Sequence, residues 1–253
     1  MASVAEQLVR IDAVTRSFGG LVAIDDVSMT TDQGELVGVI GPNGAGKTTL
    51  FNLITGFVRP TRGAITVRGQ DIARLKPHQI ARLGVARTFQ NLRIFPTMTV
   101  FDNVSVGAIG TDGVSPLKAF GSKAYSEDIS QRTWQALEQT RLTDVAEELA
   151  ANLSYGRRKY LEIARALAAQ PKLLILDEPA AGLNDSETAE LGEFIRRIHQ
   201  DGLTILLVEH DMNLVMSVCK RVMVLASGRK IADGSPDEVR NDPAVLEAYL
   251  GSE

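Results

Sequence analysis

The stretch that decides the fold is Gly41-Pro42-Asn43-Gly44-Ala45-Gly46-Lys47-Thr48, which matches the spacing G-x-x-x-x-G-K-[ST] of a phosphate-binding loop. It directly follows an apolar run at residues 36–40 and directly precedes a helical pattern that includes Leu50 and Leu53. A strand before the loop and a helix after it are the context in which this motif binds phosphate. The alternative, a glycine-rich turn with a surface lysine, does not require that context.

The residue types of this loop suit an anion. Glycines let the backbone wrap closely around a phosphate, and successive N–H groups and the helix N-terminus face it. Lys47 adds positive charge near the terminal phosphates, and the Thr48 hydroxyl is expected to bind Mg²⁺. The residues expected to contact the nucleotide here are Gly41, Pro42, Asn43, Gly44, Ala45, Gly46, Lys47, Thr48 and Thr49.

Two more apolar runs, at residues 173–176 and 205–208, are similar to the run before the loop. Continuous runs of this length with helical patterns between them predict parallel strands buried on both faces, and so an α/β fold. The polar pairs Asp177-Glu178 and Glu209-His210 directly follow these runs. Because ligands bind beyond the carboxyl ends of parallel strands, both pairs are expected to meet the phosphate loop.

The carboxylates of the first pair suit phosphate chemistry. Asp177 can hold a metal, commonly through water, and Glu178 can orient or deprotonate an attacking water. An Asp-Glu pair at a strand end is more often a helix cap when it stands alone. Together with the phosphate loop, it indicates a site that hydrolyses a nucleotide.

The rest of the chain divides into regions and has no internal repeat. Short alternating segments predict an antiparallel sheet beside the parallel core, and they lie at residues 8–14, 22–30 and 63–69. Residues 91–170 are expected to be mainly helical, with a Gly-, Ser- and Pro-rich loop at residues 107–122. Capping residues predict a helix after residues 184–186 and another after Ser235, before a last short helix that ends near Leu250.

Composition places the chain among ordinary globular proteins. Of its 253 residues, 44% are hydrophobic and 23% are charged, which excludes disordered and fibrous classes. The net charge of −4 gives no electrostatic reason to expect nucleic acid as a partner. The single cysteine, Cys219, excludes an internal disulfide and fits a reducing compartment. No apolar run approaches the roughly 18 residues of a membrane span, so a membrane partner is expected to be served from outside the lipid.

A basic helix start follows at Asn152-Leu153-Ser154-Tyr155-Gly156-Arg157-Arg158-Lys159. Three cations in a first helical turn oppose the helix dipole, which favours acidic residues there. An incoming phosphate would relieve this conflict. The alternative is a Ser154 cap with solvated basic side chains.

The order and approximate spacing of these motifs resemble ABC ATPases over essentially the whole chain. The matching segments are the phosphate loop, Gln90 within Arg87-Thr88-Phe89-Gln90, Leu153-Ser154-Tyr155-Gly156-Arg157, Leu176-Asp177-Glu178-Pro179 and Glu209-His210-Asp211. The resemblance implies a P-loop NTPase parallel-sheet core with an N-terminal antiparallel β subdomain and a mainly helical insertion. It also implies a single domain over residues 1–253, with the nucleotide-binding core at about 1–90 and 171–253 and a helical subdomain carrying the signature at about 91–170.

The same resemblance implies ATP and Mg²⁺ as ligands and a pair of subunits as the working unit. In this family two domains pair head to tail, and each ATP lies between the phosphate loop of one and the signature segment of the other. The signature residues that would serve a partner's nucleotide are Ser154, Tyr155, Gly156 and Arg157. The partner would be a second ABC ATPase, either an identical chain or a different one.

Further roles come from the resemblance alone. Phe18 resembles the aromatic residue that stacks on adenine, and Gln90 the residue that contacts the nucleotide and links its site to the helical region. His210 resembles the switch histidine at the terminal phosphate, which makes Lys47, Glu178 and His210 the candidate catalytic set. The candidate metal ligands are Thr48, Gln90 and Asp177.

Two segments depart from the family pattern. Tyr155 stands where the signature has the first glycine of a pair, and Arg157 where it has glutamine. The segment Ala181-Gly182-Leu183-Asn184 replaces the common Ser-Ala-Leu-Asp. Nucleotide contacts and coupling between subunits are therefore expected to differ in detail at these positions.

Residues 87–92, 178–184 and 240–251 narrow the resemblance to ATPase subunits of high-affinity branched-chain amino-acid importers. Such a subunit is peripheral, on the cytoplasmic face of the membrane, beneath transmembrane permease subunits that receive solute from a separate binding protein. Import of urea or amides, and a soluble ATPase of iron–sulfur assembly, stay open as alternatives. A small-molecule kinase would use the same loop but would leave residues 153–157 without a purpose.

Overall fold

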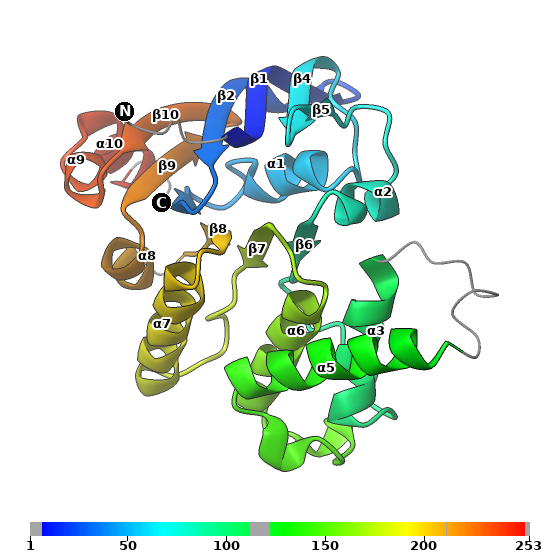
Figure 1. Cartoon of the computed structure of the whole chain (residues 1–253). Helices are drawn as coiled ribbons and strands as arrows, with labels where there is room; N and C mark the ends of the chain where they lie inside the picture. Colours follow the sequence, from blue (N-terminus) through cyan, green and yellow to red (C-terminus); the bar gives the residue numbers. More distant parts are fainter. Residues whose placement is uncertain (1–6, 112–121, 211, 251–253) are drawn as a thin grey trace, which may run out of the picture.

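A six-stranded sheet forms the centre of the computed structural model, which describes residues 7–111, 122–210 and 212–250 (Figure 1). Its strand order is β10-β9-β3-β8-β7-β6; the strands from β9 to β6 run parallel, and β10 pairs antiparallel with β9. The strands are β3 (Leu36–Ile40), β6 (Val85–Arg87), β7 (Leu173–Asp177), β8 (Thr204–Val208), β9 (Arg221–Ala226) and β10 (Arg229–Gly234). The three parallel strands that the sequence predicts, β3, β7 and β8, are thus confirmed and are neighbours.

Alternate residues of the central sheet enter two different hydrophobic cores. In β3, Leu36 and Ile40 pack into one core, and Val37 and Val39 pack into the other. Every residue of β3, β7 and β8 is buried. Because both faces are covered, these strands carry runs of apolar residues instead of alternating apolar and polar residues.

An antiparallel sheet covers one face of the central sheet, with α1 (Lys47–Ile54) packed in the core between them (Figure 1). Its strand order is β2-β1-β4-β5, which confirms the antiparallel sheet predicted near the amino terminus. The elements of this layer are β1 (Gln7–Phe18), β2 (Leu21–Asp32), β4 (Arg62–Val67), β5 (Gln70–Asp71) and the adjoining α2 (Pro77–Arg82). The first two strands are longer than the predicted segments because they pair along one long hairpin with several register shifts.

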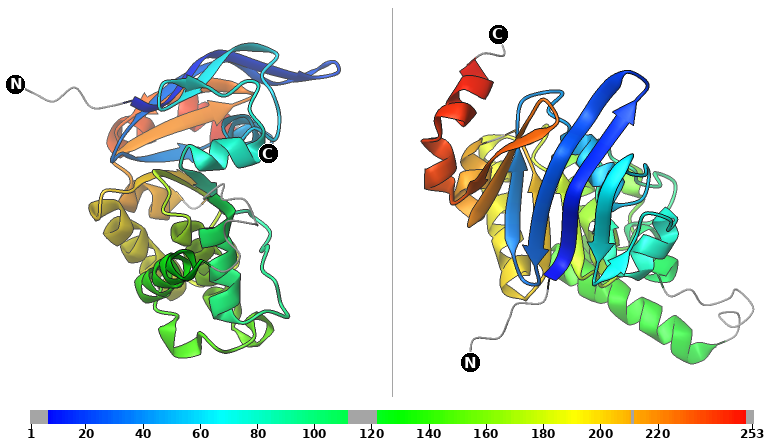
Figure 2. Two further views of the ribbon diagram at one scale, coloured as in Figure 1. Left: turned by 45° about the vertical axis from the view of Figure 1, so that its right-hand side comes forward. Right: turned by 90° about the horizontal axis from the view of Figure 1, so that it is seen from above.

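Between β6 and β7, the described residues form a helical region that projects from the two sheets (Figure 2) and contains three helices. They are α3 (Val100–Thr111), α5 (Lys123–Gln139) and α6 (Tyr155–Ala168), with 3₁₀ turns at Thr143–Val145 and Ala150–Asn152. The predicted loop at residues 107–122 is wrong at its start, because α3 continues to Thr111; residues 112–121 lie outside the described residues, and Ser122 caps α5. Close packing of α3 on α6 explains the glycine at position 107, because a Cβ there would lie 1.9 Å from the Arg165 carbonyl oxygen.

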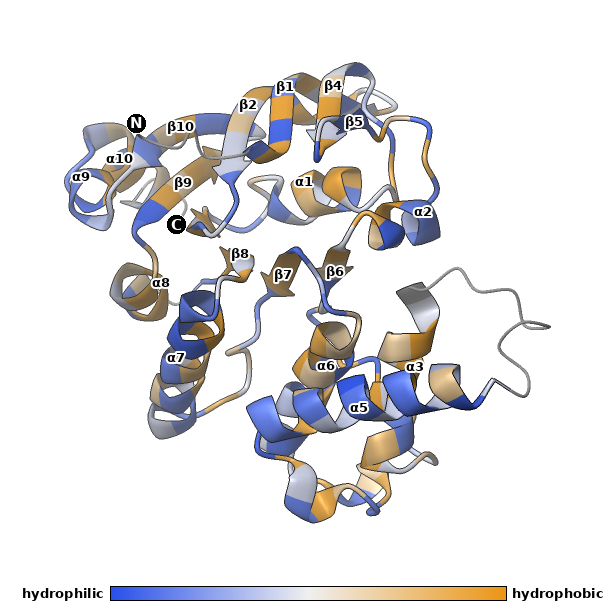
Figure 3. Ribbon diagram, in the orientation of Figure 1, coloured by the Kyte–Doolittle hydropathy of each residue, from blue (hydrophilic) through white to orange (hydrophobic). Residues whose placement is uncertain are grey.

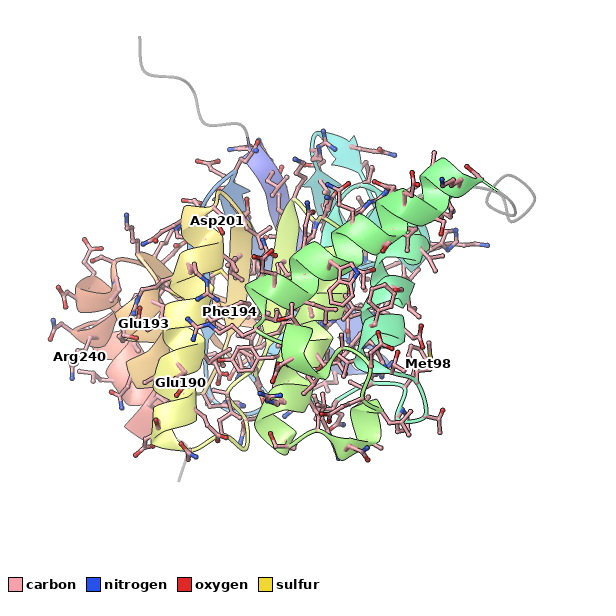
Figure 4. All side chains as sticks on the ribbon, turned by 60° about the horizontal axis from the view of Figure 1, so that its bottom comes forward. Met98, Glu190, Glu193, Phe194, Asp201 and Arg240 are labelled. Atoms are coloured by element: carbon pink, nitrogen blue, oxygen red, sulfur yellow. The ribbon has the colours of Figure 1, made fainter. Side chains whose placement is uncertain are left out.

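The helices α7 (Asp185–Gln200) and α8 (Met212–Val218) pack into the core on the face of the central sheet opposite α1. Asn184, one of the predicted capping residues, caps α7 and forms a reciprocal pair with Glu187. Phe194 lies on the side of α7 towards α5 and α6, and its ring meets Tyr160 edge to face at 5.4 Å between centroids (Figure 4). Hydrophilic residues line the outward sides of α5 and α7 (Figure 3), which is the pattern of helices buried on one face only.

The C-terminal segment packs beside β9 and β10. It contains α9 (Pro236–Arg240) and α10 (Pro243–Leu250), and Ser235 caps α9 in the predicted capping box with Glu238. Within the three described ranges, no helix is both long enough and apolar enough to cross a membrane.

Candidate functional site

A cleft of about 640 Å³ lies at the edge where the central strands end. Segments that follow β3, β6, β7, β8 and β9 supply most of its lining, and the β1–β2 hairpin supplies the rest. The lining residues are Phe18, Leu21, Val22, Ala23, Asn43, Gly44, Ala45, Gly46, Lys47, Thr48, Thr49, Gln90, Glu178, His210, Ser227 and Gly228. Of the two polar pairs that the sequence expects at this edge, Glu178 and His210 line the cleft, whereas Asp177 and Glu209 do not.

The phosphate loop folds around the side chain of Lys47, the first residue of α1. Lys47 Nζ donates hydrogen bonds to the carbonyl oxygens of Gly41 at 2.6 Å and Pro42 at 3.1 Å. Burial lowers the pKa of Lys47, and the nearby carboxylates of Glu178 and Asp177 partly oppose this shift. The carbonyl groups of Gly41 and Pro42 thus hold the Lys47 side chain, while the other loop residues line the cleft.

Glu178 is held in the cleft by two side chains from different loops. Gln90 Nε2 donates to Oε2 of Glu178 at 2.6 Å, and His210 Nε2 lies 2.5 Å from Oε1. Only 11% of the Glu178 side chain is exposed. Its φ of +49° is a left-handed conformation that non-glycine residues seldom adopt and that clusters at functional sites. The structure therefore fixes both the backbone and the carboxylate of this residue.

Asp177 lies behind the cleft wall, paired with Arg87. The Arg87 guanidinium meets the Asp177 carboxylate at 2.7 Å, and both side chains are almost completely buried. Arg87 also donates to Asn52 of α1 at 2.7 Å, so it ties β6 and β7 to the helix that follows the phosphate loop. Sequence reasoning missed this residue, although it stands in the segment that was matched for Gln90.

Glu209 fixes the turn that follows Glu178. Its carboxylate accepts hydrogen bonds from the backbone N–H groups of Ala180 at 2.6 Å and His210 at 3.2 Å. Burial raises the pKa of Glu209, and these two hydrogen bonds act against that shift. The residue thereby joins the turn after β7 to the turn after β8.

Comparison with known proteins identifies this arrangement. A family model described as ABC transporter matches residues 24–181. The chain belongs to the ABC transporter family. A second model, described as branched-chain amino acid ATP-binding cassette transporter, matches residues 229–253.

Full-length relatives place the chain among the LivG-type ATP-binding proteins of that family. The high-affinity branched-chain amino acid transport ATP-binding protein LivG of Salmonella typhimurium is 46% identical, over 98% of this chain and 99% of the relative. BraF of Pseudomonas aeruginosa, with the same description, is 41% identical, over 96% and 98%. The ADP conformation of MJ1267, an ATP-binding cassette of an ABC transporter, shares the fold with a TM-score of 0.85 and 32% identity, over 97% of this chain and 99% of that one. The expected ABC ATPase fold is thus confirmed, and with it an ATPase whose hydrolysis is coupled to transport.

An aromatic side chain lies at the mouth of the cleft. Phe18 is 44% exposed, at the end of β1. The guanidinium of Arg16 lies 4.3 Å from the centroid of its ring. An exposed aromatic face beside a phosphate loop can stack on a nucleotide base.

The segment 153–157, which resembles the family signature, lies at the start of α6, and none of its residues lines this chain's own cleft. The Ser154 hydroxyl caps the helix by accepting from Arg157 N, and the Arg157 guanidinium pairs with Asp144 at 2.9 Å. The basic residues are not simply solvated, because Arg158 donates to the carbonyl of Leu153 at 2.9 Å and Lys159 is buried. The start of α6 is therefore held by contacts within its own chain. Asp211, the last residue of the Glu209-His210-Asp211 match, lies outside the described residues.

Proposed function

We propose that the chain is the ATP-hydrolysing motor subunit of an importer for branched-chain amino acids, peripheral on the cytoplasmic face of the membrane. The observation that carries the hydrolytic site is the Glu178 carboxylate, bonded by Gln90 and His210 in a cleft shared with Lys47 and the phosphate loop. The match of residues 229–253 to the branched-chain family model and the names of the full-length relatives support the solute.

The side chains of the cleft divide the work of hydrolysis. The loop N–H groups and Lys47 bind the phosphates, and Lys47 exchanges its two carbonyl partners for phosphate oxygens of similar polarity. Glu178 accepts a proton from, or orients, the attacking water. His210 and Gln90 hold the two oxygens of that carboxylate and lie at the terminal phosphate. Phe18 stacks on the base.

The cleft fits Mg²⁺ that arrives with the nucleotide. The Thr48 side chain is exposed in the cleft, and within the described residues no group of three His, Cys, Asp or Glu side chains could hold a metal alone. Mg²⁺ commonly takes only one or two protein ligands and completes its shell with phosphate oxygens and water. Thr48 and Gln90 would hold it directly and Asp177 through water, and it would neutralise phosphate charge during hydrolysis.

Two further partners follow from the proposal. A second ABC ATPase, identical or different, receives the signature residues Ser154, Tyr155, Gly156 and Arg157 at its nucleotide. The chain works as one domain, in which about residues 91–170 form the helical subdomain that carries this segment. A solute-binding protein takes part indirectly, through the permease.

An apolar groove of about 400 Å³ supplies the surface for the permease. It runs between α2 and β6 on one side and α3 and α6 on the other, and Phe57, Phe89 and Val106 line it. Phe89 is adjacent in sequence to Gln90, which lines the nucleotide cleft, so one short loop borders both cavities. Glu162 of α6 steadies this loop by accepting a hydrogen bond from Phe89 N at 3.2 Å.

The test uses the Glu178→Gln chain, which keeps the shape of the side chain and removes the base. Hydrolysis should fall by about 10²–10⁴-fold while ATP binding is retained, and normal hydrolysis would remove Glu178 from this role. Tagged Glu178→Gln chain is then captured from gently solubilised native cells with ATP and Mg²⁺, and its partners are identified by mass spectrometry. Multi-span permeases with a second ATPase are expected. Recovery of a soluble scaffold alone would contradict the importer and favour iron–sulfur assembly.

A further inference from the structure

Tyr155, which replaces a signature glycine, lies against the turn that follows Glu178 in its own chain. It is the first residue of α6, and its hydroxyl donates a hydrogen bond to the carbonyl oxygen of Ala181 at 3.1 Å. A Cβ added to Gly182 would lie 2.9 Å from Cε1 and 3.2 Å from Cζ of the Tyr155 ring. The phenol therefore fills the space that a side chain at position 182 would need.

This contact joins the two segments in which the sequence departs from the family pattern. Gly182 has a φ of +82°, a conformation that glycine adopts without strain and alanine does not. Tyr155 and Gly182 are thus complementary in shape, because a bulky ring on α6 meets a residue without a side chain on the turn.

A second contact, one helical turn further along α6, reaches the backbone of Glu178. Lys159 Nζ lies 5.6 Å from the centroid of the Tyr155 ring and donates to the Glu178 carbonyl oxygen at 3.4 Å. The Lys159 residue is only 3% exposed. Tyr155 and Lys159 are four residues apart and so lie on one face of α6, which is the face packed on residues 178–182.

The turn is also held at its other side by Glu209 and by backbone hydrogen bonds of its own. Glu209 binds Ala180 N, and within the turn Ala181 N donates to the Glu178 carbonyl oxygen at 3.2 Å. Glu178 itself is held in a left-handed conformation that costs free energy. A side chain that anchors Ala181 and Gly182 from outside is therefore well placed to keep Glu178 in that conformation.

We propose that Tyr155 is a positioning residue for hydrolysis, which holds the turn 178–182 against the start of α6 and so fixes the Glu178 carboxylate. The inference rests on the proposed function of Glu178 as the residue that acts on water. Because Ser154 and Gly156 flank Tyr155 and are assigned to the nucleotide of a partner subunit, Tyr155 links occupancy of that partner site to Glu178 of its own chain.

The test compares Tyr155→Phe, which removes only the hydroxyl, with Tyr155→Gly, which removes the ring. The full chain, with Glu178 unchanged, is assayed alone and together with the partner subunits for kcat, for affinity for ADP and for thermal stability. We expect kcat to fall about 3-fold for Tyr155→Phe and about 10-fold or more for Tyr155→Gly, with ADP affinity within about 2-fold of the wild type. Tyr160→Phe is the matched control, because that ring packs on Phe194 and should leave kcat unchanged.

A double variant separates positioning from general loss of structure. Gly182→Ala should lower kcat through both backbone strain and the clash with the ring. In a Tyr155→Gly background the strain remains and the clash is gone, so the same change should lower kcat less. Three outcomes would overturn the proposal. They are a wild-type kcat in both Tyr155 variants, additive effects on kcat in the double variant, and losses of ADP affinity as large as the losses of kcat. Glu178→Gln, prepared in the same way, tests the proposed function independently. If Glu178→Gln is inactive while Tyr155→Gly is fully active, only the role of Tyr155 is rejected.

Discussion

Arg87 and Asp177 form an ion pair behind the cleft whose side chains are only 5% and 6% exposed. Taking two charges out of water is costly, and the mutual attraction of the pair offsets that cost only while both partners are present. The Arg87 guanidinium has a second partner in Asn52, which the strand order brings close. Arg87 therefore holds in place a carboxylate that is assigned to the metal shell.

Removing Arg87 alone should be strongly destabilising. We expect Arg87→Met to lower the free energy of unfolding by about 3 kcal/mol, because Asp177 is left buried and unpaired. Arg87→Met combined with Asp177→Asn should recover much of that loss, since no orphan charge remains. Urea unfolding followed by circular dichroism measures each value. Arg74→Met, at an exposed position, is the control and should stay within about 0.5 kcal/mol of the wild type. A double variant as unstable as the single one would show that the unpaired charge is not the cause.

The contrast between Arg87 and Lys47 explains which site residues the sequence can predict. Lys47, Glu178 and His210 each directly follow a buried strand or its loop, so strand order alone brings them to one edge of the sheet. The partner of Arg87 lies 90 residues further along the chain, and no local spacing encodes that pair. In the sequence, Tyr155 stands out only as a departure from a motif, because the turn 178–182 that it contacts is likewise distant along the chain.

At the scale of elements, Arg221 joins three strands from both sheets. Its guanidinium donates from Nε to Asp233 Oδ1 at 2.7 Å, and from Nη1 to the Thr30 carbonyl of β2 at 3.0 Å. Lys230 Nζ adds a hydrogen bond to Asp233 at 3.1 Å. Burial acts to raise the pKa of Asp233, but the hydrogen bonds and charges of Arg221 and Lys230 outweigh it and leave the pKa below its ordinary value.

Asp233→Asn should weaken this junction in a manner that depends on pH. The folded-state pKa of Asp233 is lowered, so its contribution is present above the unfolded pKa of about 4 and is lost as the pH falls through the folded value. We therefore expect a loss of about 1–2 kcal/mol in unfolding free energy at neutral pH, from hydrogen bonds to a charged group. Urea unfolding at a series of pH values should show the difference from wild type shrinking in acid. A difference independent of pH would contradict a charge-based role, and Asp12→Asn, at an exposed carboxylate, is the control.

Elements were predictable where their pattern is local. The continuous apolar runs of β3, β7 and β8 exceed what a loop would carry, and capping residues marked α7 and α9. β6 has only three residues, too few for either periodicity to appear, and β10 contains Lys, Asp and Gly and depends on pairing with β9. The sequence does not predict the end of α3 for another reason, since Gly107 reflects close packing on α6 and not a loop.

On the scale of the whole molecule, one loop separates the nucleotide cleft from the apolar groove. Phe89 lines the groove and Gln90 reaches Glu178 in the cleft, so a partner that shifts the loop also shifts a hydrogen bond to the Glu178 carboxylate. Phe57 is 54% exposed in the groove, and its ring meets Phe89 edge to face at 6.0 Å. An aromatic side chain this exposed in an apolar groove is suited to anchor a partner.

Phe57→Ser should therefore separate transport from nucleotide chemistry. We expect capture of permease subunits by the Glu178→Gln chain to fall about 10- to 100-fold when Phe57→Ser is added, because truncation of an aromatic anchor commonly costs that much affinity. ATP binding should be unchanged, since Phe57 does not line the cleft. Leu246→Ser is the matched control, as Leu246 is 49% exposed on α10, on the opposite side of the molecule from α2 and α3 (Figure 1). Quantitative mass spectrometry of the captured material measures both variants. If permease recovery with Phe57→Ser equals that with Leu246→Ser, the groove is not the docking surface, and the loop at Gln90 must receive its signal from elsewhere.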